Sequence, residues 1–521
     1  MKKILIFLLL NFFVAESLFA QSEFNFRYGS SFFDRARKTI KTKDGNFIVV
    51  GRTNGFGSAG NAFMMKVNQS GNILWLKDYD GINQEEFFDV IEAQNGNIVE
   101  CGTTESYGAG NYDAVIMETD SIGNMLWAKA YGNVYAEYFF KISEDAANGF
   151  YVAGLAQKVP SFTTGTVLLK IDSEGNIIWN RWVAAWCSEG DWYPIDMTKT
   201  LDGGVLLTGC YNHVSCWKFS SAGNLIWSNS YSPDGGGFSE GLSILEDVVG
   251  NIYLNSIIYG VASSVDIAIL KLQSNGNFVW LKSYGGTYTD EDRSISNTSD
   301  TGIIISGFTN SAGNGDFDAC LIKLNHFGSV QWAKAYGGAW NESTANAIQT
   351  SDGGYLFTGQ TFPLGTNNDS SKVYLVKTNS LGNSSCNSVS WSPIEGNETV
   401  TVSSTLVPDT ITLHENPISW SVNSRSFYEI NICDYNGLKP IDANDYWEIF
   451  PNPATNEIKI TNLSPTENQI SIYNLLGQQV KSIRVSNVQS TILPVSDLPA
   501  GIYVVTIFDG EKIVCKKFVK E

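Results

Sequence analysis

Gly175-Asn176-Ile177-Ile178-Trp179 is one copy of a motif, Gly-Asn-x-x-Trp, that sets the organisation of the chain. The other copies end at Trp75, Trp127, Trp227, Trp280 and Trp332, the last with Ser329 in place of Asn. Successive Trp residues are 52, 52, 48, 53 and 52 positions apart. A period of about 50 residues is the signature of a repeat architecture, so one structural unit recurs along the chain.

A second mark, a turn followed by an apolar run that ends in Gly, shows how many units there are. It occurs at 44–51, 95–102, 148–154, 202–209, 300–307 and 352–359, with a degenerate copy at 250–255. The sequence therefore contains seven units.

The sequence of each unit predicts four strands. In the first copy they lie at 35–42, 47–52, 63–67 and 73–79. Turns rich in Gly, Asn and Asp separate them, and these residues accept the positive φ that tight hairpins require. Four short strands in about 50 residues is the pattern of one β-propeller blade. We therefore predict an all-β chain in which residues 21–383 form a seven-bladed β-propeller of four-stranded blades.

The N-terminal strand is predicted to close the last blade. In the seventh unit Ser384-Ser385-Cys386 follows the turn, where the other units have a Trp strand. Residues 24–29 end in Tyr28-Gly29, which matches the end of a Trp strand elsewhere, as at Ala335-Tyr336-Gly337. Closure by this strand would remove the exposed sheet edges of an open ring.

Charge and the first residues indicate a secreted protein that does not bind nucleic acid. The chain has 53 acidic and 34 basic residues, a formal net charge of −19, and no basic run longer than a pair, which does not suit a phosphate-binding surface. Residues 1–20 have the form of a signal peptide: Lys2-Lys3, an apolar run from Ile4 to Ala15, then Ala20. We expect no transmembrane segment after its cleavage, because no later apolar stretch is long enough.

The last 75 residues predict a second, smaller unit. Alternating strands and turns over residues 446–521 indicate a small β-sandwich. Its marks, in chain order, are Pro451, Asn452 and Pro453, then Gly477, then Pro499, Gly501 and Tyr503, and a basic end with Lys517.

These marks resemble the C-terminal (Por) sorting domain of type IX secretion cargo in Bacteroidota. The resemblance implies that residues 446–521 engage the type IX secretion machinery. It also implies that the protein is secreted, to the extracellular space or the outer cell surface. The repeat is similar to those of secreted propeller proteins that carry this signal.

The repeated Trp is interpreted as a packing residue between blades. The motif also resembles the tryptophan-docking repeat of quinoprotein dehydrogenases, but the chain has no vicinal Cys pair and a different turn. These departures argue against a quinone, and no cofactor is predicted apart from the calcium considered below.

Residues 384–445, between the two units, are rich in Ser, Thr, Asn and Val, and the alternation at 398–403 predicts strands in a connector. Cys386 and Cys433 bracket this connector, so a disulfide between them is predicted for an oxidising compartment. Cys210 and Cys216 flank a short loop and are a second candidate pair.

The long loops of such a ring lie on one face and are the expected place for binding. Aromatic residues in or near them, Trp182, Trp186, Trp192 and Trp340, are candidates for stacking on a sugar or a peptide. The alternative is local packing of the loops.

An acid recurs six residues after the Tyr that ends the Trp strand, at Asp34, Glu85, Glu137, Asp290 and Glu342. A ring of such acids can bind a cation such as Ca²⁺, or supply a carboxylate pair for glycoside chemistry. Repetition in nearly every unit favours a third interpretation, in which the carboxylates accept hydrogen bonds from backbone N–H groups of a neighbouring blade.

The sequence thus favours a secreted binding or adhesion propeller whose ligand is a glycan or a protein. The alternative is an extracellular carbohydrate-active enzyme, a hydrolase or lyase that uses carboxylates on the loop face. No catalytic constellation is identified.

Overall fold

The computed structural model describes residues 23–521, except 57–58, 160–162, 185–194, 212, 235–241, 260–264, 315, 363–370, 405–406, 435–447, 462–467, 475–478, 487 and 509–512. The predicted signal peptide, residues 1–20, lies outside the described residues. The chain divides into two compact units, Met1–Glu429 and Ile430–Glu521. In the described residues both units are built from β-strands, with one short 3₁₀ helix, η3 (Ile432–Asp434).

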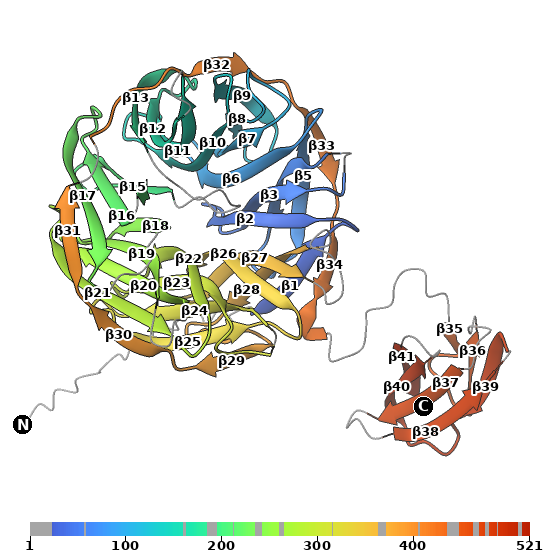
Figure 1. Cartoon of the computed structure of the whole chain (residues 1–521). Coiled ribbons are helices and arrows are strands. Elements are labelled where there is room, and N and C mark those ends of the chain that lie inside the picture. Colours follow the sequence, from blue (N-terminus) through green and yellow to red (C-terminus); the bar gives the residue numbers. More distant parts are fainter. Residues whose placement is uncertain are drawn as a thin grey trace, which may run out of the picture. The chain divides into compact units, whose positions relative to one another are not determined.

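The first unit contains seven antiparallel sheets, which we number 1 to 7. Sheets 1 to 3 are β2 (Asp34–Lys41), β3 (Phe47–Thr53), β4 (Asn61–Val67) and β5 (Ile73–Asp80); β6 (Glu85–Glu92), β7 (Ile98–Thr104), β8 (Asp113–Thr119) and β9 (Met125–Gly132); and β10 (Glu137–Glu144), β11 (Phe150–Lys158), β12 (Thr163–Ile171) and β13 (Ile177–Ala184). Sheets 4 and 5 are β14 (Asp196–Lys199), β15 (Val205–Tyr211), β16 (His213–Phe219) and β17 (Leu225–Pro233); and β18 (Ser243–Glu246), β19 (Ile252–Tyr259), β20 (Val265–Leu272) and β21 (Phe278–Gly285). Sheets 6 and 7 are β22 (Asp290–Asn297), β23 (Ile303–Thr309), β24 (Asp318–Leu324) and β25 (Val330–Tyr336); and β26 (Asn341–Gln349), β27 (Tyr355–Phe362), β28 (Lys372–Thr378) and β1 (Phe24–Gly29). Figure 1 shows the sheets side by side around a common centre, with strands such as β2, β6 and β26 innermost.

The two ends of this unit meet in sheet 7. β1 pairs antiparallel with β28, with Phe24 opposite Lys377 and Tyr28 opposite Val373. Phe24, Phe26 and Tyr28 are buried in one apolar cluster with residues of sheets 1 and 7. The N-terminal strand therefore takes the place of the missing fourth strand, as the sequence predicts.

The repeated Trp joins each sheet to the next one. A Cβ at Gly123, in the last turn of sheet 2, would lie only 3.1 Å from the ring of Trp75 in sheet 1, and the positive φ of 76° would strain any other residue there. Tyr79 Oη donates a hydrogen bond of 2.9 Å to the carbonyl of the same Gly123. Equivalent Trp–Gly contacts join Trp127 to Gly175, Trp179 to Gly223, Trp227 to Gly276, Trp280 to Gly328 and Trp332 to Gly382.

β1 completes this series of contacts without a Trp. Phe26 lies against Gly71 of sheet 1, and Tyr28 Oη donates a hydrogen bond of 2.6 Å to the Gly71 carbonyl. Sheet 7, through β1, is thus joined to sheet 1 by the same kind of contact that joins the other neighbouring sheets.

The sequence predicts strands in the connector but not where they lie: in the structure they add a strand to the outer edge of most sheets. The connector strands run back around the ring from sheet 6 to sheet 7: β29 (Ser388–Trp391) on β25, β30 (Ile394–Glu398) on β21, β31 (Val400–Ser404) on β17, β32 (His414–Pro417) on β9, β33 (Ser421–Arg425) on β5 and β34 (Tyr428–Asn431) beside β1. At sheet 3 the connector makes an isolated bridge between Asp409 and Trp182. The prediction of four strands per sheet is therefore incomplete, because sheet 3 alone keeps four among the described strands. Covering the outer edges leaves fewer backbone groups open to pairing with another chain.

The second unit consists of two sheets. They are β35 (Glu448–Phe450), β36 (Glu457–Thr461) and β39 (Ser490–Pro494), and β37 (Asn468–Asn474), β38 (Gln479–Val485), β40 (Gly501–Phe508) and β41 (Ile513–Lys520). Ile458 and Ile460 of the first sheet share one buried cluster with Ile470, Val505 and Phe518 of the second. One apolar core between the two sheets holds this unit together.

Candidate functional site

The five recurring acids lie at the connections between sheets, and each is almost fully buried, with 0–4% of its surface exposed. Each carboxylate accepts a hydrogen bond from the backbone N–H four residues earlier, just after the outer strand of the preceding sheet. These bonds run from Ser30 to Asp34 (2.7 Å), Gly81 to Glu85 (3.3 Å), Asn133 to Glu137 (3.0 Å), Gly286 to Asp290 (2.7 Å) and Gly338 to Glu342 (3.3 Å). In four of the five sites a Thr hydroxyl from the next strand also donates to the carboxylate: Thr53, Thr104, Thr309 and Thr361.

In the described residues these contacts are those of the interpretation that the sequence favours, in which the acids accept hydrogen bonds at the connections, rather than those of a cation-binding ring. None of the described residues form a group of three or more His, Cys, Asp or Glu side chains that could hold a metal ion. The physical reason is that each carboxylate satisfies the donors of its own connection, so the acids tie neighbouring sheets together. The same engagement leaves them unsuited to act as an exposed pair in glycoside chemistry.

Glu137 departs from the pattern. Ala156 stands opposite it, where the other sheets have a Thr, and its Oε1 atom is buried without a hydrogen-bond partner. Asp113 lies close by, since a Cβ at Gly132 would overlap both carboxylates. Burial, and then the negative charge of Asp113, raise the pKa of Glu137 to about 7.

We expect Glu342→Ala to lower the free energy of unfolding by about 1–3 kcal/mol, because the buried Thr361 hydroxyl and the partly buried Gly338 N–H would lose their acceptor. Glu174→Ala, at an exposed turn position, is the matched control and should change it by less than about 0.5 kcal/mol. Urea unfolding of both variants measures the difference. An unchanged midpoint for Glu342→Ala, or a midpoint that rises on addition of Ca²⁺ to the wild type only, contradicts the role as a clamp.

We expect the stability to decline between about pH 5 and pH 8 because of these acids. Burial raises the pKa of Glu85 to about 7 and that of Glu342 to about 8. An unfolded Glu loses its proton near pH 4.3, so the native state holds extra protons above that pH, and the stability this gives is lost as the pH rises through the native pKa values. Calorimetry of the wild type and of a variant with Gln at positions 85, 137 and 342 checks this. The variant should show a flatter pH profile, and parallel profiles would refute the assignment.

The aromatic candidates for ligand stacking are not exposed where the structure describes them. Trp182 is buried, at 6% exposure, because the connector residue Asp409 pairs with its backbone and Lys158 covers its ring. Trp340 is half-buried beneath the guanidinium of Arg27, 3.6 Å from the ring centroid. Burial thus argues against Trp182 as a stacking residue, Trp340 keeps only part of its surface open, and Trp186 and Trp192 lie outside the described residues.

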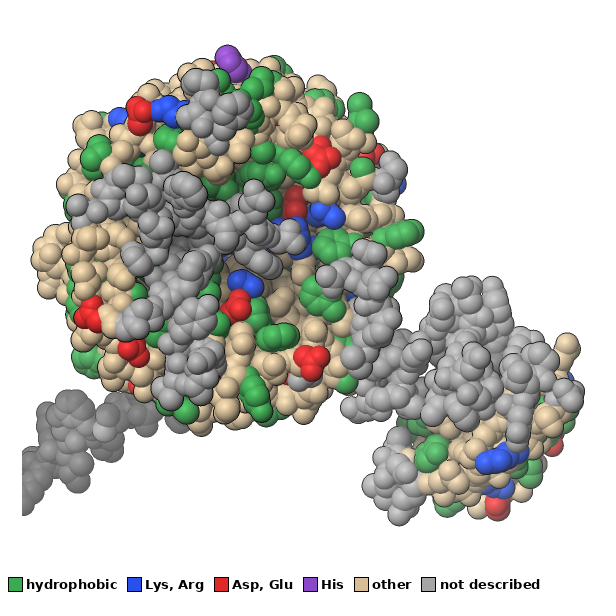
Figure 2. All heavy atoms as spheres, viewed as in Figure 1, with side chains coloured by type: hydrophobic (Ala, Val, Ile, Leu, Met, Phe, Trp, Pro, Cys, Tyr) green, Lys and Arg blue, Asp and Glu red, His purple; other side chains and the backbone are tan. Residues whose placement is uncertain are grey.

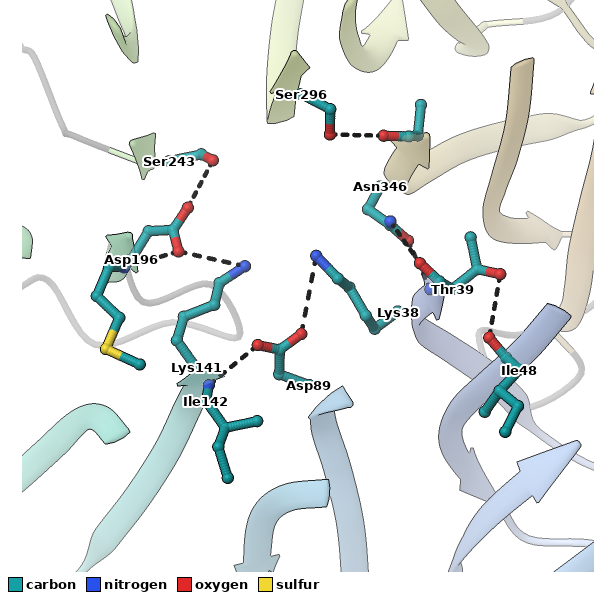
Figure 3. A network of polar contacts seen from close by, with 12 residues as sticks. Lys38, Thr39, Ile48, Asp89, Lys141, Ile142, Asp196, Ser243, Ser296 and Asn346 are labelled. Atoms are coloured by element: carbon teal, nitrogen blue, oxygen red, sulfur yellow. Dashed lines mark hydrogen bonds and ion pairs between the residues drawn. The ribbon is translucent and has the colours of Figure 1, made fainter. Parts of the chain in front are cut away.

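A polar network lines the centre of the ring, from residues that sequence reasoning did not select (Figure 3). Lys38 Nζ lies 3.7 Å from Asp89 Oδ1, and Lys141 Nζ lies 3.5 Å from Asp196 Oδ1. Each of these acids also reaches a backbone N–H of the next sheet, at Ile142 (3.1 Å) and Ile244 (3.0 Å). On the face shown in Figure 2, basic and acidic side chains lie next to one another around the centre.

The network also crosses from the last sheet to the first. Asn346 Oδ1 accepts a hydrogen bond of 2.8 Å from the Thr39 N–H, and Asn346 Nδ2 donates one of 3.0 Å to the Thr39 carbonyl. These bonds join parts of the chain 307 residues apart. The centre of the ring is therefore held by specific polar contacts as well as by the apolar packing between sheets.

The central residues occupy one repeated position on the first strand of each sheet. Opposite each of them, on the second strand, stands the residue just before the repeated Gly, or just before the residue that replaces this Gly. In chain order the central residues are Lys38, Asp89, Lys141, Asp196, Ser243, Ser294 and Asn346. Burial lowers the pKa of Lys38, whereas for Lys141 the nearby carboxylates, Asp196 first, outweigh the effect of burial and raise the pKa. The signal that could have found this position is its spacing, four residues after a recurring acid such as Glu85.

A pocket of about 450 Å³ opens where the connector passes the loops of sheets 2 and 3. Its lining comes from three loops on one face and from the connector: Ala109, Asn133, Val134, Lys158, Val159, Thr410, Ile411, Thr412 and His414. Volumes of this size are usual for small-molecule sites. This pocket is the strongest candidate binding site among the described residues.

The walls of the pocket are held in place by hydrogen bonds. Trp182 and Asp409 exchange two backbone bonds of 2.7 Å, and the side-chain amide of Asn180 both donates to and accepts from the backbone of Ile411. Asn133 Nδ2 donates a bond of 2.9 Å to the Gln157 carbonyl. The site is therefore formed before any ligand arrives.

The cysteines differ from the predicted pairs in one case. Cys386 and Cys433 are each disulfide-bonded. Cys216 is a free, buried thiol, so the predicted bridge to Cys210 is wrong. In the strand register Cys216 stands opposite Thr208 and Cys210 opposite Val214. The two cysteines are thus diagonal neighbours, and about 7–8 Å between such positions is too far for a disulfide.

In the second unit, marks at opposite ends of the segment meet. Asn452 Oδ1 accepts a hydrogen bond of 2.8 Å from the Val519 N–H, and Asn452 Nδ2 donates one of 3.3 Å to the Lys517 carbonyl. Tyr503 Oη donates a bond of 2.8 Å to the Pro499 carbonyl, and its ring stacks on Phe518. Gly477 lies outside the described residues. The marks between positions 451 and 519 thus build one compact fold.

Residues 448–521 match a family model, the secretion system C-terminal sorting domain. The chain ends in a type IX sorting domain. This sorting domain shows that the protein is exported by the type IX secretion system to the cell surface or the extracellular space. No described helix is long and apolar enough to cross a membrane.

Comparison of the whole chain with known proteins adds little. No curated protein matches it. Among solved structures, a protein of unknown function from Bacteroides caccae has 13% identity and a TM-score of 0.34, covering 56% of this chain and 93% of its own. A protein of unknown function from Dyadobacter fermentans has 11% identity and a TM-score of 0.39, covering 68% of this chain and 98% of its own. A copper-bound fungal alcohol oxidase has 13% identity and a TM-score of 0.42, covering 96% and 99%. Similarities this low support no conclusion about activity.

Proposed function

We propose that residues 21–383 form a seven-bladed β-propeller that binds a glycan or a protein outside the cell. Seven sheets in chain order, the closing strand β1 and the Trp–Gly contacts between neighbours support the seven-bladed ring. The sorting domain supports a site of action beyond the outer membrane.

The main observation in support of a binding function is the pocket beside the connector. It lies on the face where the long loops gather, and loops held by a rigid scaffold are the usual place for recognition. The recurring acids, by contrast, are buried and accept hydrogen bonds at the connections between sheets. A binding protein therefore accounts for the described residues better than a carbohydrate-active enzyme does.

A glycan and protein array probed with the secreted full chain tests this function. Val134→Trp, which fills the pocket from an exposed position, should abolish the array signal. Val248→Trp is the matched control, since Val248 is similarly exposed (71% against 65%) and lies outside the pocket lining. Equal array signals for both variants, or no ligand at all, would overturn the proposal.

A further inference from the structure

The lining of the pocket differs from the acidic chain as a whole. Its titratable lining residues are Lys158 and His414, and none of the nine lining residues is an acid, although the chain carries a formal net charge of −19. Thr410 and Thr412 add hydroxyl groups, and Asn133 adds an amide. A ligand that fits these groups is small, hydroxylated and negatively charged.

Aliphatic side chains complete the lining. Val134 and Val159 are 65% and 50% exposed, and Ile411 is buried. Exposed valines at the mouth of a polar pocket offer an apolar surface to the C–H face of a sugar ring, while Thr hydroxyls and a Lys offer hydrogen bonds to its edge. A pocket of about 450 Å³ has room for a single sugar residue with its water.

Lys158 is the cation that would face the ligand. Its Nζ pairs with Asp409 Oδ2 and lies 5.0 Å from the ring centroid of Trp182. The Asp409 side chain is 66% exposed, and an ion pair this open to water contributes little to stability. A carboxylate from a ligand can therefore replace that of Asp409 at little cost.

From these observations we propose that the pocket binds an acidic sugar residue, whose carboxylate pairs with Lys158 and whose ring lies against Val134 and Val159. This inference rests on the proposed binding function and specifies the chemistry of its ligand. The recognised unit is the carboxylate-bearing sugar, either free or at the end of a glycan.

Titration calorimetry of the full chain tests it with glucuronate, galacturonate, glucose and the methyl glycosides of both acids. We expect binding of the acids and at least tenfold weaker binding of glucose. Lys158→Met should weaken binding of the acids at least tenfold, and Lys199→Met, an exposed lysine outside the pocket lining, should not. Asp409→Asn removes the competing carboxylate and should tighten binding of the acids, which keeps the test valid if Lys158→Met fails to fold.

The possible failures are distinguishable. Equal binding of glucose and glucuronate, with no effect of Asp409→Asn, overturns the acidic specificity but leaves a sugar-binding pocket. Binding of none of these sugars, while the array still finds a ligand that Val134→Trp abolishes, overturns the sugar and retains the binding function. Binding of the free acids but not of their methyl glycosides identifies free sugar acids as the source.

Discussion

Deleting residues 23–29 should lower the thermal midpoint of the protein by at least about 10 °C or cause it to aggregate. The deletion removes β1, exposes the edge of β28 and uncovers the apolar cluster shared by sheets 1 and 7. It also removes the Phe26 and Tyr28 contacts to Gly71. Scanning calorimetry of the purified protein measures the effect.

A milder pair of variants separates ring closure from a general loss of apolar residues. Phe26→Ala should cost about 3–5 kcal/mol, because Phe26 is 9% exposed and packs between sheets. Phe32→Ala, at 58% exposure, should cost much less. Similar midpoints for the two variants would argue against closure by β1.

Removing residues 447–521 should stop export across the outer membrane in a host with type IX secretion. The first unit would then accumulate in the periplasm, because the segment that matches the sorting domain is absent. Immunoblots of medium, outer membrane and periplasm measure the distribution, and the thermal midpoint of the retained protein controls for misfolding. A folded, truncated protein in the medium would contradict the role of this segment.

The repeat could be predicted from the sequence because each of its marks has a local physical cause. The turn Gly at positions such as 123 takes a positive φ of 76° and lies under a Trp ring, so Gly and Trp recur together and are easy to see. The position of β1 could be predicted for the same reason, since Tyr28 repeats the role of Tyr79. Local chemistry repeated at a fixed spacing is visible without a structure.

The central network and the place of the connector strands could not be predicted in this way. The central position is filled by Lys, Asp, Ser or Asn, so no single residue type marks it, and its contacts depend on the neighbouring sheet. The connector strands have no repeat, and the edges they cover lie far away in the sequence. Trp182 is an example, since a connector residue more than 200 positions later pairs with its backbone.

Hydrogen exchange of the secreted full chain, followed by mass spectrometry, tests the closed ring most directly. If β1 closes sheet 7 and the connector covers the outer edges, then peptides spanning 24–29 and 388–404 exchange as slowly as those from β28 and β25, with which β1 and β29 pair. Exchange of residues 24–29 within seconds, while β28 stays protected, would show that the ring is open and would contradict the account.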